Sequence, residues 1–357
     1  MTTGTPALPR HSHKILSVVD SHTCGQPTRV IINGLPIPAG MTPTDTRQMV
    51  QGQWDWMRRL AVFEPRGHRS MFAAALIPPE AVGGVHGVLF MDANGYPDMC
   101  GHATIGTATT LIELGLVGPE APDFTGTFEF PLDTPAGRLH LRASLDNGRC
   151  VSVAFRSPGA YHVGDVTIEM AGRPVVAEVA YGGQYYAFVP VEAAGLAVEP
   201  DAIDALIAAA APVRDAIARQ GGLIDPRTGL APTVGNIVWV GTPEAGKADG
   251  LNVPVSSSNS FDRSPCGTAT CARMAALVAK GRLDLEERFV NQGIMGTLYV
   301  GRAFAPQADD GTQASPLDGI VPEVEGSAWI TARSDLLLDP ADPLGHGYLI
   351  ANGPAIL

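Results

Sequence analysis

Two segments of this 357-residue chain follow one pattern: residues 100–115 read CGHATIGTATTLIELG, and residues 266–281 read CGTATCARMAALVAKG. Each begins Cys-Gly-x-Ala-Thr, continues through mostly small and apolar residues, and reaches a glycine fifteen positions after its cysteine. Glycine directly after the last turn is typical of a helix C-terminus, because it readily adopts the left-handed conformation needed there. The pattern predicts two equivalent helices, each starting at a cysteine. The alternative is a chance likeness between two alanine-rich helices.

The distance between the two segments predicts the domain organisation. Cys266 follows Cys100 by 166 residues, close to half the chain, and 357 residues are more than one hydrophobic core usually organises. We therefore expect two related α/β domains. The expected boundaries are residues 13–157 plus 340–357 for the domain with Cys100, 158–339 for the domain with Cys266, and 1–12 for a flexible N-terminal tail.

Outside these segments, short β-like runs separated by glycine and proline dominate the sequence. The runs that we predict as strands are 15–20, 28–32, 85–91, 127–130, 137–143, 150–155, 175–180, 185–189 and 236–240. Helical patterns are fewer: one covers 44–60, and another covers 201–219, where Pro212 is expected to split the helix. Because strands outnumber helices, we predict an α/β (α+β) fold with mixed sheets rather than a regular βαβ repeat.

Composition and charge argue against several classes of protein. The 24 basic and 36 acidic residues give a net charge of −12, which disfavours binding to nucleic acid or to an anionic membrane surface. No apolar run approaches the roughly 20 residues of a membrane span, and the N-terminal stretch does not have the pattern of a signal peptide. We expect a cytoplasmic protein whose partner is a small molecule.

The cysteines and lysines limit the kinds of catalytic mechanism that the sequence suggests. The chain has five cysteines and no CxxC pair, which does not suit a disulfide framework, so we expect free thiols in a reducing cytoplasm. Lysine occurs only as Lys14, Lys247 and Lys280, and none stands where a Schiff-base or pyridoxal mechanism would place it. The sequence therefore favours chemistry that does not use lysine.

Cys100 and Cys266 are the candidate catalytic residues, because both stand where a loop turns into a helix. The free N–H groups and partial positive charge of a helix start lower the pKa of a thiol and bind an anion. The glycine that follows each cysteine lets a ligand approach the backbone. Two such helix starts facing each other would hold one carboxylate with a sulfur on each side. That arrangement suits removal of a proton from one face of a carbon and delivery of a proton to the other face.

A free cysteine is more often a buried structural residue than a catalytic one. We keep that interpretation for Cys24, Cys150 and Cys271.

Other sites fit the same residues less well. Residues 101–106 have the glycine spacing of a phosphate loop but lack the Lys-Ser/Thr pair that should follow. Zinc ligation by Cys100, His102 and Cys266 would lack a CxxC or HExxH cluster. A cysteine hydrolase would pair Cys100 with His102, but two residues this close on one helix do not face each other. His102 is either a ligand contact or an ordered histidine at a helix start. Asp262 is either a plain helix N-terminal carboxylate or, as we favour, the group that receives a substrate ammonium.

Two longer motifs resemble the signature segments of the proline racemase family: Asp98-Met99-Cys100-Gly101-His102 with Thr104-Ile105-Gly106, and Asp262-Arg263-Ser264-Pro265-Cys266-Gly267-Thr268. The resemblance extends over most of the chain, through residues 20–23, 64–68, 181–183, 326–328 and 342–344. That family comprises proline racemases, 4-hydroxyproline 2-epimerases and trans-3-hydroxyproline dehydratases. The resemblance implies two pseudo-symmetric domains, each a mixed β-sheet curled around a central helix as in diaminopimelate epimerase, and a homodimer.

The resemblance also implies a role for each matched residue. Cys100 and Cys266 would be the acid and base of a two-thiol mechanism that needs no cofactor and no metal. The substrate carboxylate would be held by the backbones of Gly101, His102, Gly267 and Thr268, and the ring nitrogen would be contacted by His102 and Asp262.

The resemblance distinguishes two reactions on this fold. The dehydratases carry threonine where this chain has Cys266, so the second thiol implies a racemase or epimerase that inverts Cα of 4-hydroxyproline or proline by 1,1-proton transfer. Residues 63–68 and 70–72 look more like the proline racemase and dehydratase branches, which keeps dehydration of trans-3-hydroxy-L-proline as the alternative. A non-catalytic amino-acid-binding protein is the alternative from a different class.

Overall fold

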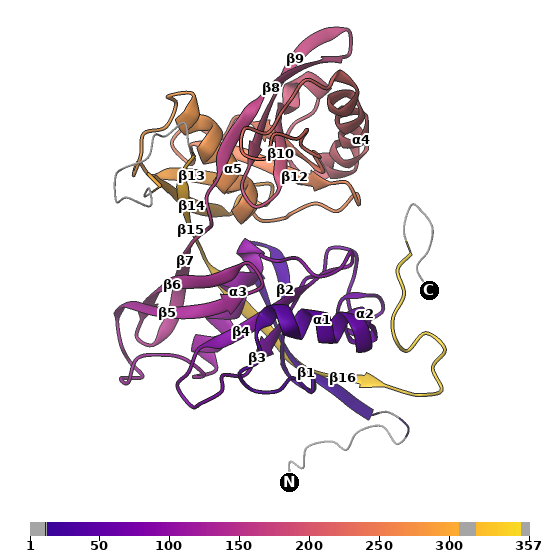
Figure 1. Ribbon diagram of the computed structural model, residues 1–357, viewed down its shortest axis with the longest axis vertical. Coiled ribbons are helices and arrows are strands. Elements are labelled where there is room, and N and C mark those ends of the chain that lie inside the picture. Colours follow the sequence, from indigo (N-terminus) through magenta and orange to yellow (C-terminus); the bar gives the residue numbers. More distant parts are fainter. Residues whose placement is uncertain (1–10, 12, 307–318, 351–357) are drawn as a thin grey trace.

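The computed structural model describes residues 11, 13–306 and 319–350, which form two lobes that meet at a narrow waist (Figure 1). One continuous ladder of sixteen strands runs through both lobes, in the order β16-β1-β2-β3-β4-β5-β6-β7-β15-β14-β13-β12-β11-β10-β9-β8. Two parts of the expected domain division lie outside the described residues: the flexible tail over 1–12, apart from residue 11, and residues 351–357 of the first domain.

The first lobe wraps a mixed sheet around helix α3 (Gly101–Glu113). Its strands are β1 (His13–Thr23), β2 (Gln26–Asn33), β3 (Ala73–Ile77), β4 (His86–Met91), β5 (Gly126–Thr134), β6 (Gly137–Asp146), β7 (Arg149–Arg156) and β16 (Ala328–Leu338). All residues of α3 from Gly101 to Ile112 are buried, which explains why this helix has no polar face. Helices α1 (Pro43–Gln53) and α2 (Asp55–Val62) cover the other side of the sheet.

The second lobe repeats this plan around helix α5 (Gly267–Ala279), which is also largely buried. Its strands are β8 (Tyr161–Met170), β9 (Arg173–Tyr181), β10 (Tyr185–Pro190), β11 (Asn236–Gly241), β12 (Gly250–Ser256), β13 (Phe289–Gly293), β14 (Leu298–Phe304) and β15 (Val321–Gly326). Helix α4 (Ile203–Gln220) covers the outer side of this sheet, after the short 3-10 helices η1 (Val191–Ala194) and η2 (Pro200–Ala202).

Both central helices end as the sequence predicts. Gly115 and Gly281 follow the last residues of the two helices with φ values of 65° and 63°, the left-handed conformation that glycine adopts without strain. Each of the nine predicted strands overlaps an observed strand. The predicted α/β fold class, with a mixed sheet around one central helix in each half, is confirmed.

Strand alternation lets each sheet pack against two layers of helices. Successive side chains of a strand point to opposite faces. In β10, Tyr186 and Phe188 pack toward α5, whereas Ala187 and Val189 pack toward α4. A strand covered on both faces, such as β10, is therefore apolar along its length, and the inner side chain of Tyr186 reaches Thr268 at the start of α5.

The two lobes join through β7 and β15, which pair antiparallel. The chain crosses back to the first lobe at Ser327, and β16 then pairs with β1 from His13 to Thr23. The sequence placed residues 158–339 together in the second domain, whereas strand pairing assigns 328–338 to the first sheet. The difference arises because β16 completes the sheet of the first lobe at its open edge.

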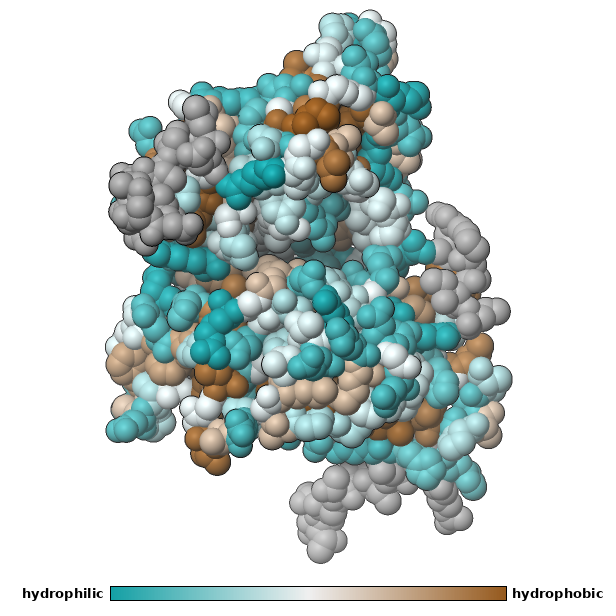
Figure 2. Space-filling view, in the orientation of Figure 1, coloured by the Kyte–Doolittle hydropathy of each residue, from teal (hydrophilic) through white to brown (hydrophobic). Residues whose placement is uncertain are grey.

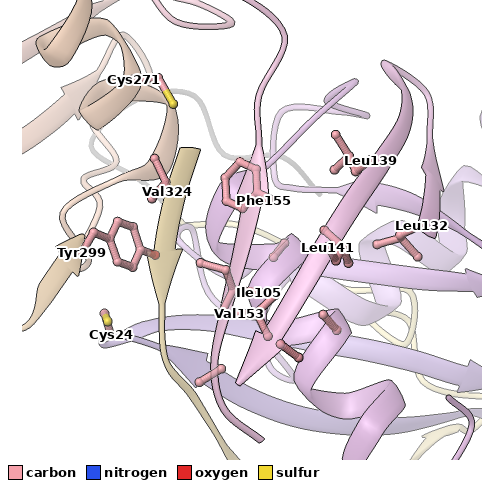
Figure 3. Packing of buried hydrophobic residues seen from close by; sticks show 14 of the residues in the cluster. Cys24, Ile105, Leu132, Leu139, Leu141, Val153, Phe155, Cys271, Tyr299 and Val324 are labelled. Carbon is pink, nitrogen blue, oxygen red and sulfur yellow. The ribbon is translucent and has the colours of Figure 1, made fainter. Parts of the chain in front are cut away.

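One apolar core continues across the waist (Figure 3). It joins Ile105 of α3 and Phe155 of β7 in the first lobe with Cys271 of α5, Tyr299 of β14 and Val324 of β15. Because close-packed interiors transmit position from one element to the next, this core holds the two central helices in a fixed relation.

Two helix predictions were wrong in detail. The helix expected over 44–60 is interrupted at Trp54, which has φ −135° and ψ 28°, so that α1 and α2 bury separate faces. Helix α4 continues through Pro212. Pro212 and Ala208 are both exposed, so water can satisfy the carbonyl that the missing N–H leaves free. No helix in the described part of the chain is long and apolar enough to cross a membrane.

Candidate active site

The starts of α3 and α5 touch at the waist. A Cβ added to Gly101 would lie 3.0 Å from the Cα of Gly267, and one added to Gly267 would lie 3.1 Å from the Cα of Gly101. Such distances are tighter than nearly all real Cβ contacts, so the absence of a Cβ at both positions lets the two backbones approach this closely. The two cysteines that precede these glycines are the N-caps of the two helices. The structure therefore brings together Cys100 and Cys266, one from each lobe.

A hollow of about 580 Å³ opens between the lobes beside these helix starts. Its lining includes Met99, next to Cys100, and Thr268, two residues after Cys266. It continues into a wider hollow of about 730 Å³ that includes the hydroxyl-bearing Ser256, Ser258 and Ser260. The surface is visibly hollowed between the two lobes (Figure 2). Both halves of the chain therefore line these hollows, which reach the residues beside the two cysteines.

The first half of the site pairs a thiol with an imidazole. Cys100 has extended backbone angles, φ −147° and ψ 118°, and its Sγ lies 3.2 Å from Nδ1 of His102. The prediction that these two side chains do not face each other was wrong, because Cys100 precedes the helix rather than belonging to it. His102 is 7% exposed and packs edge-on against Phe72, with ring centroids 4.9 Å apart.

The second half of the site is built differently. Cys266 has φ 63°, a left-handed value that is unusual for a residue with a Cβ. The turn before it is tied by Ser264, whose Oγ accepts from the Cys266 N–H at 3.1 Å and donates to Asp262 Oδ1 at 2.8 Å. Thr268 Oγ1 lies 3.6 Å from Cys266 Sγ, and the hydroxyl of Tyr186 lies 2.6 Å from Thr268 Oγ1. Asp262 therefore stands in the same turn as the second thiol.

Burial decides the protonation of these groups. It raises the pKa of the Cys100 thiol well above its usual value, and together with the nearby Asp262 carboxylate it raises the pKa of Cys266 to about 12. The sequence led us to expect helix starts that lower both values. The backbone N–H groups of Ala103 and Ala269 do act in that direction, but loss of hydration outweighs them. Burial also lowers the pKa of His102, which is therefore neutral at pH 7.

The other three cysteines lie in the protein interior. Cys24, Cys150 and Cys271 are buried, in keeping with a structural role. Within residues 11, 13–306 and 319–350, no group of three His, Cys, Asp or Glu side chains is placed to hold a metal ion, so the zinc alternative has no geometric support. Sequence reasoning missed Phe72, Ser264 and Tyr186 as neighbours of the site. Only Ser264 carried a local signal, since it lies between Asp262 and Cys266.

This geometry suits proton transfer at one carbon. A carboxylate held between two helix starts would meet backbone N–H groups from both lobes. A carbon attached to that carboxylate would have one sulfur near each of its faces, and the two thiols are the groups that can remove and supply a proton there.

Comparison with known proteins agrees with the resemblance seen in the motifs. The family model described as proline racemase matches residues 18–349. A 4-hydroxyproline 2-epimerase from Streptosporangium roseum is 35% identical over 94% of this chain and 99% of its own. A proline racemase from Acetoanaerobium sticklandii is 31% identical over the same shares. A trans-L-3-hydroxyproline dehydratase from Xenopus tropicalis is 35% identical over 97% of this chain and 98% of its own.

Solved structures show the same fold. A hydroxyproline epimerase from Agrobacterium vitis, crystallised with bound trans-4-hydroxy-L-proline, superposes with a TM-score of 0.76 and 23% identity, covering 96% of this chain and 97% of its own.

Proposed function

The chain belongs to the proline racemase family, and from this premise we propose that it inverts Cα of 4-hydroxyproline or proline without a cofactor. The observation that supports the proposal most strongly is the contact between the two helix starts, which brings together one cysteine from each lobe. Inversion of a stereocentre needs a base on one face and an acid on the other, and the pair Cys100 and Cys266 meets that need.

In the proposed reaction the thiolate of one cysteine takes the α-proton from one face of the substrate. The thiol of the other cysteine then gives its proton to the opposite face, so the pair ends with the opposite protonation. Negative charge grows on the carboxylate as the Cα–H bond breaks. The backbone N–H groups of Gly101, His102, Gly267 and Thr268 would stabilise that charge at the two helix starts.

Two side chains are proposed to orient the ring. His102 is neutral and nearly buried beside Cys100, and Asp262 is the carboxylate of the turn before Cys266. A carboxylate on one side and an imidazole on the other suit the protonated ring nitrogen of a proline. Holding that nitrogen would align the Cα–H bond with one sulfur.

Dehydration of trans-3-hydroxy-L-proline is the second candidate, because a dehydratase is as similar in sequence as an epimerase, each being 35% identical. Dehydration needs a base for the α-proton and loss of the 3-hydroxyl, without proton delivery to the opposite face. A second thiol at position 266 is what inversion requires, and it supports the racemase or epimerase reaction.

The test is incubation with L-proline, trans-4-hydroxy-L-proline and trans-3-hydroxy-L-proline in deuterated water, followed by NMR. We expect an inverted product that holds deuterium at Cα from one of the first two substrates. An unsaturated or imine product from the third, without inversion of the others, would replace the proposal with dehydration. Thermal stabilisation by these amino acids without any deuterium exchange would indicate a binding protein instead.

A further inference from the structure

Tyr186 lies behind the second thiol. Strand alternation directs it from β10 toward α5, where it packs with Ala269 and Ala272 in a cluster that Cys266 adjoins. The side chain is 3% exposed. Its hydroxyl lies 2.6 Å from Thr268 Oγ1 and 4.0 Å from Cys266 Sγ. With Thr268 Oγ1 3.6 Å from that sulfur, the three groups form a small polar triangle in apolar surroundings.

The distances indicate the direction of the hydrogen bonds. Burial, and then the neighbouring Cys266, raise the pKa of Tyr186 well above its usual value, so the phenol keeps its hydrogen. If Tyr186 donates to Thr268, the threonine hydrogen is free to point at Cys266 Sγ, 3.6 Å away. In the reverse order the tyrosine hydrogen would have to reach the sulfur over 4.0 Å. The shorter path favours donation from tyrosine to threonine to sulfur.

We propose that Tyr186 is a positioning residue for Cys266: its hydroxyl donates to Thr268 Oγ1 and thereby turns the Thr268 hydrogen toward the sulfur. The inference rests on the proposed function, in which Cys266 alternates between thiol and thiolate. A hydrogen aimed at the sulfur stabilises the thiolate form. In this arrangement Tyr186, which belongs to the second lobe, acts on the sulfur through Thr268.

The surroundings of the other thiol make this effect specific to one cysteine. Cys100 Sγ lies beside the imidazole of His102, which is backed by the ring of Phe72. A change at Tyr186 should therefore alter the reactivity of Cys266 and leave that of Cys100 as it was.

The experiment measures thiolate formation directly, in the full-length protein without substrate. Iodoacetamide reacts with thiolates, and peptide mass spectrometry with fragment ions reports the alkylation of Cys266 and Cys100 separately in one sample. We expect Tyr186→Phe to slow alkylation of Cys266 at pH 9 by about tenfold, the effect of one lost hydrogen bond. Alkylation of Cys100 should keep its rate.

Further variants separate positioning from a general structural effect. Thr268→Val should slow the alkylation of Cys266 to a similar extent. Thr268→Ser, which keeps the hydroxyl, should restore the alkylation rate. In the double variant Tyr186→Phe/Thr268→Val, the alkylation of Cys266 should be no slower than in Thr268→Val alone, because the tyrosine acts through the threonine. Tyr161→Phe is the matched control, since it removes another buried hydroxyl, bonded to Asp225 at 2.8 Å, in the same lobe.

Three results would overturn the inference: an unchanged Cys266 rate in Tyr186→Phe, equal slowing at both cysteines, or additive effects in the double variant. None of these measurements needs turnover. A normal alkylation pattern in a protein that inverts no proline would count against the proposed function alone.

Discussion

The two halves of the site begin from the same sequence pattern and place their cysteines in different surroundings. Cys100 precedes its helix in extended conformation, 3.2 Å from the imidazole of His102. Cys266 has a left-handed φ of 63° and lies between Asp262 in its turn and the hydroxyl of Thr268. The backbone plan is repeated, whereas the neighbours of the sulfur are not.

The proposed substrate gives a reason why the two sulfurs have different neighbours. A proline presents two faces of Cα to the two thiols, but its ring and its ammonium group each lie on one side only. A pair of helix starts related by pseudo-symmetry can hold a symmetric carboxylate, while the groups around the ring cannot be repeated. We therefore expect changes to the shared backbone to affect both thiols and changes to the neighbouring side chains to affect one.

The largest effect is expected from the thiols themselves. Cys100→Ser and Cys266→Ser should each lower inversion by about 10³-fold or more, because a hydroxyl is a far weaker acid than a thiol, so it neither forms the anion that removes the α-proton nor readily donates a proton. Polarimetry with the substrate identified in the NMR panel measures the loss. Cys150→Ser, which changes a buried cysteine beside Thr109 and Glu113 in the last turns of α3, should retain turnover. Near-normal inversion in either active-site variant would refute the two-thiol assignment.

The contact between the helix starts is the next most sensitive feature. Gly101→Ala or Gly267→Ala would put a Cβ 3.0 or 3.1 Å from the facing glycine, so the facing helix start would have to shift. We expect a loss of about 1 to 3 kcal/mol in the free energy of unfolding, together with loss of most activity. Chemical denaturation measures the first and polarimetry the second.

Gly52→Ala is the control for these variants. Gly52 lies in α1 with nothing within 4 Å of an added Cβ, so alanine should stabilise the helix by up to about 1 kcal/mol. Equal stability of Gly52→Ala and Gly101→Ala would show that the helix starts do not meet as described.

The pH dependence tests the buried state of both thiols. Their pKa values are raised, that of Cys266 to about 12, so at neutral pH the substrate-free protein holds mostly thiols. Since the reaction needs one thiolate, kcat/KM should rise by up to about tenfold per pH unit from pH 6 to 8. A rate that is flat over this range would mean that a thiolate is already formed at pH 6.

The same shifts predict a loss of stability in alkali. The folded state favours the protonated thiols, so their contribution is fully present below the ordinary thiol pKa and is lost as pH rises toward the folded-state values. Denaturation at pH 7 and pH 10 should show a smaller alkaline loss in the double variant Cys100→Ser/Cys266→Ser than in the unchanged protein.

A smaller effect separates the two thiols. After burial, the charge of Asp262 raises the pKa of both thiols, and at Cys266 a side-chain hydrogen bond with Asp262 raises the pKa further. Asp262→Asn keeps an oxygen that can accept from Ser264 and removes the charge. Iodoacetamide should therefore react faster with Cys266, by less than about tenfold, and the acceleration at Cys100 should be smaller. Asp92→Asn removes a charge that raises the pKa of Cys100. It should therefore accelerate the alkylation of Cys100 more than that of Cys266. Equal acceleration of both cysteines by Asp262→Asn would contradict the asymmetry.

The extent of prediction from sequence differs between backbone and side chains. The paired Cys-Gly segments sufficed for both central helices and their terminal glycines, because these depend on local conformational preferences. They did not predict that Tyr186 would reach Thr268, since β10 and α5 are brought together only by the folded sheet. The raised thiol pKa was missed for the same reason: the helix start is a local feature, and burial is not.

The domain boundary shows a similar limit. Ser327 and the residues after it follow β15 in the chain, yet β16 returns to pair with β1 more than 300 residues earlier. Nothing local distinguishes a strand of one sheet from a strand of the other, because both have the same alternating pattern.

The isotope pattern of the first turnovers in deuterated water tests the two-thiol account most directly. If separate thiols serve the two faces of Cα, the early inverted product should hold one solvent deuterium at Cα, while the remaining substrate keeps its original hydrogen. If a single group removes and returns the proton, deuterium should enter the remaining substrate as fast as it enters the product. The account predicts the first pattern, and the second would contradict it.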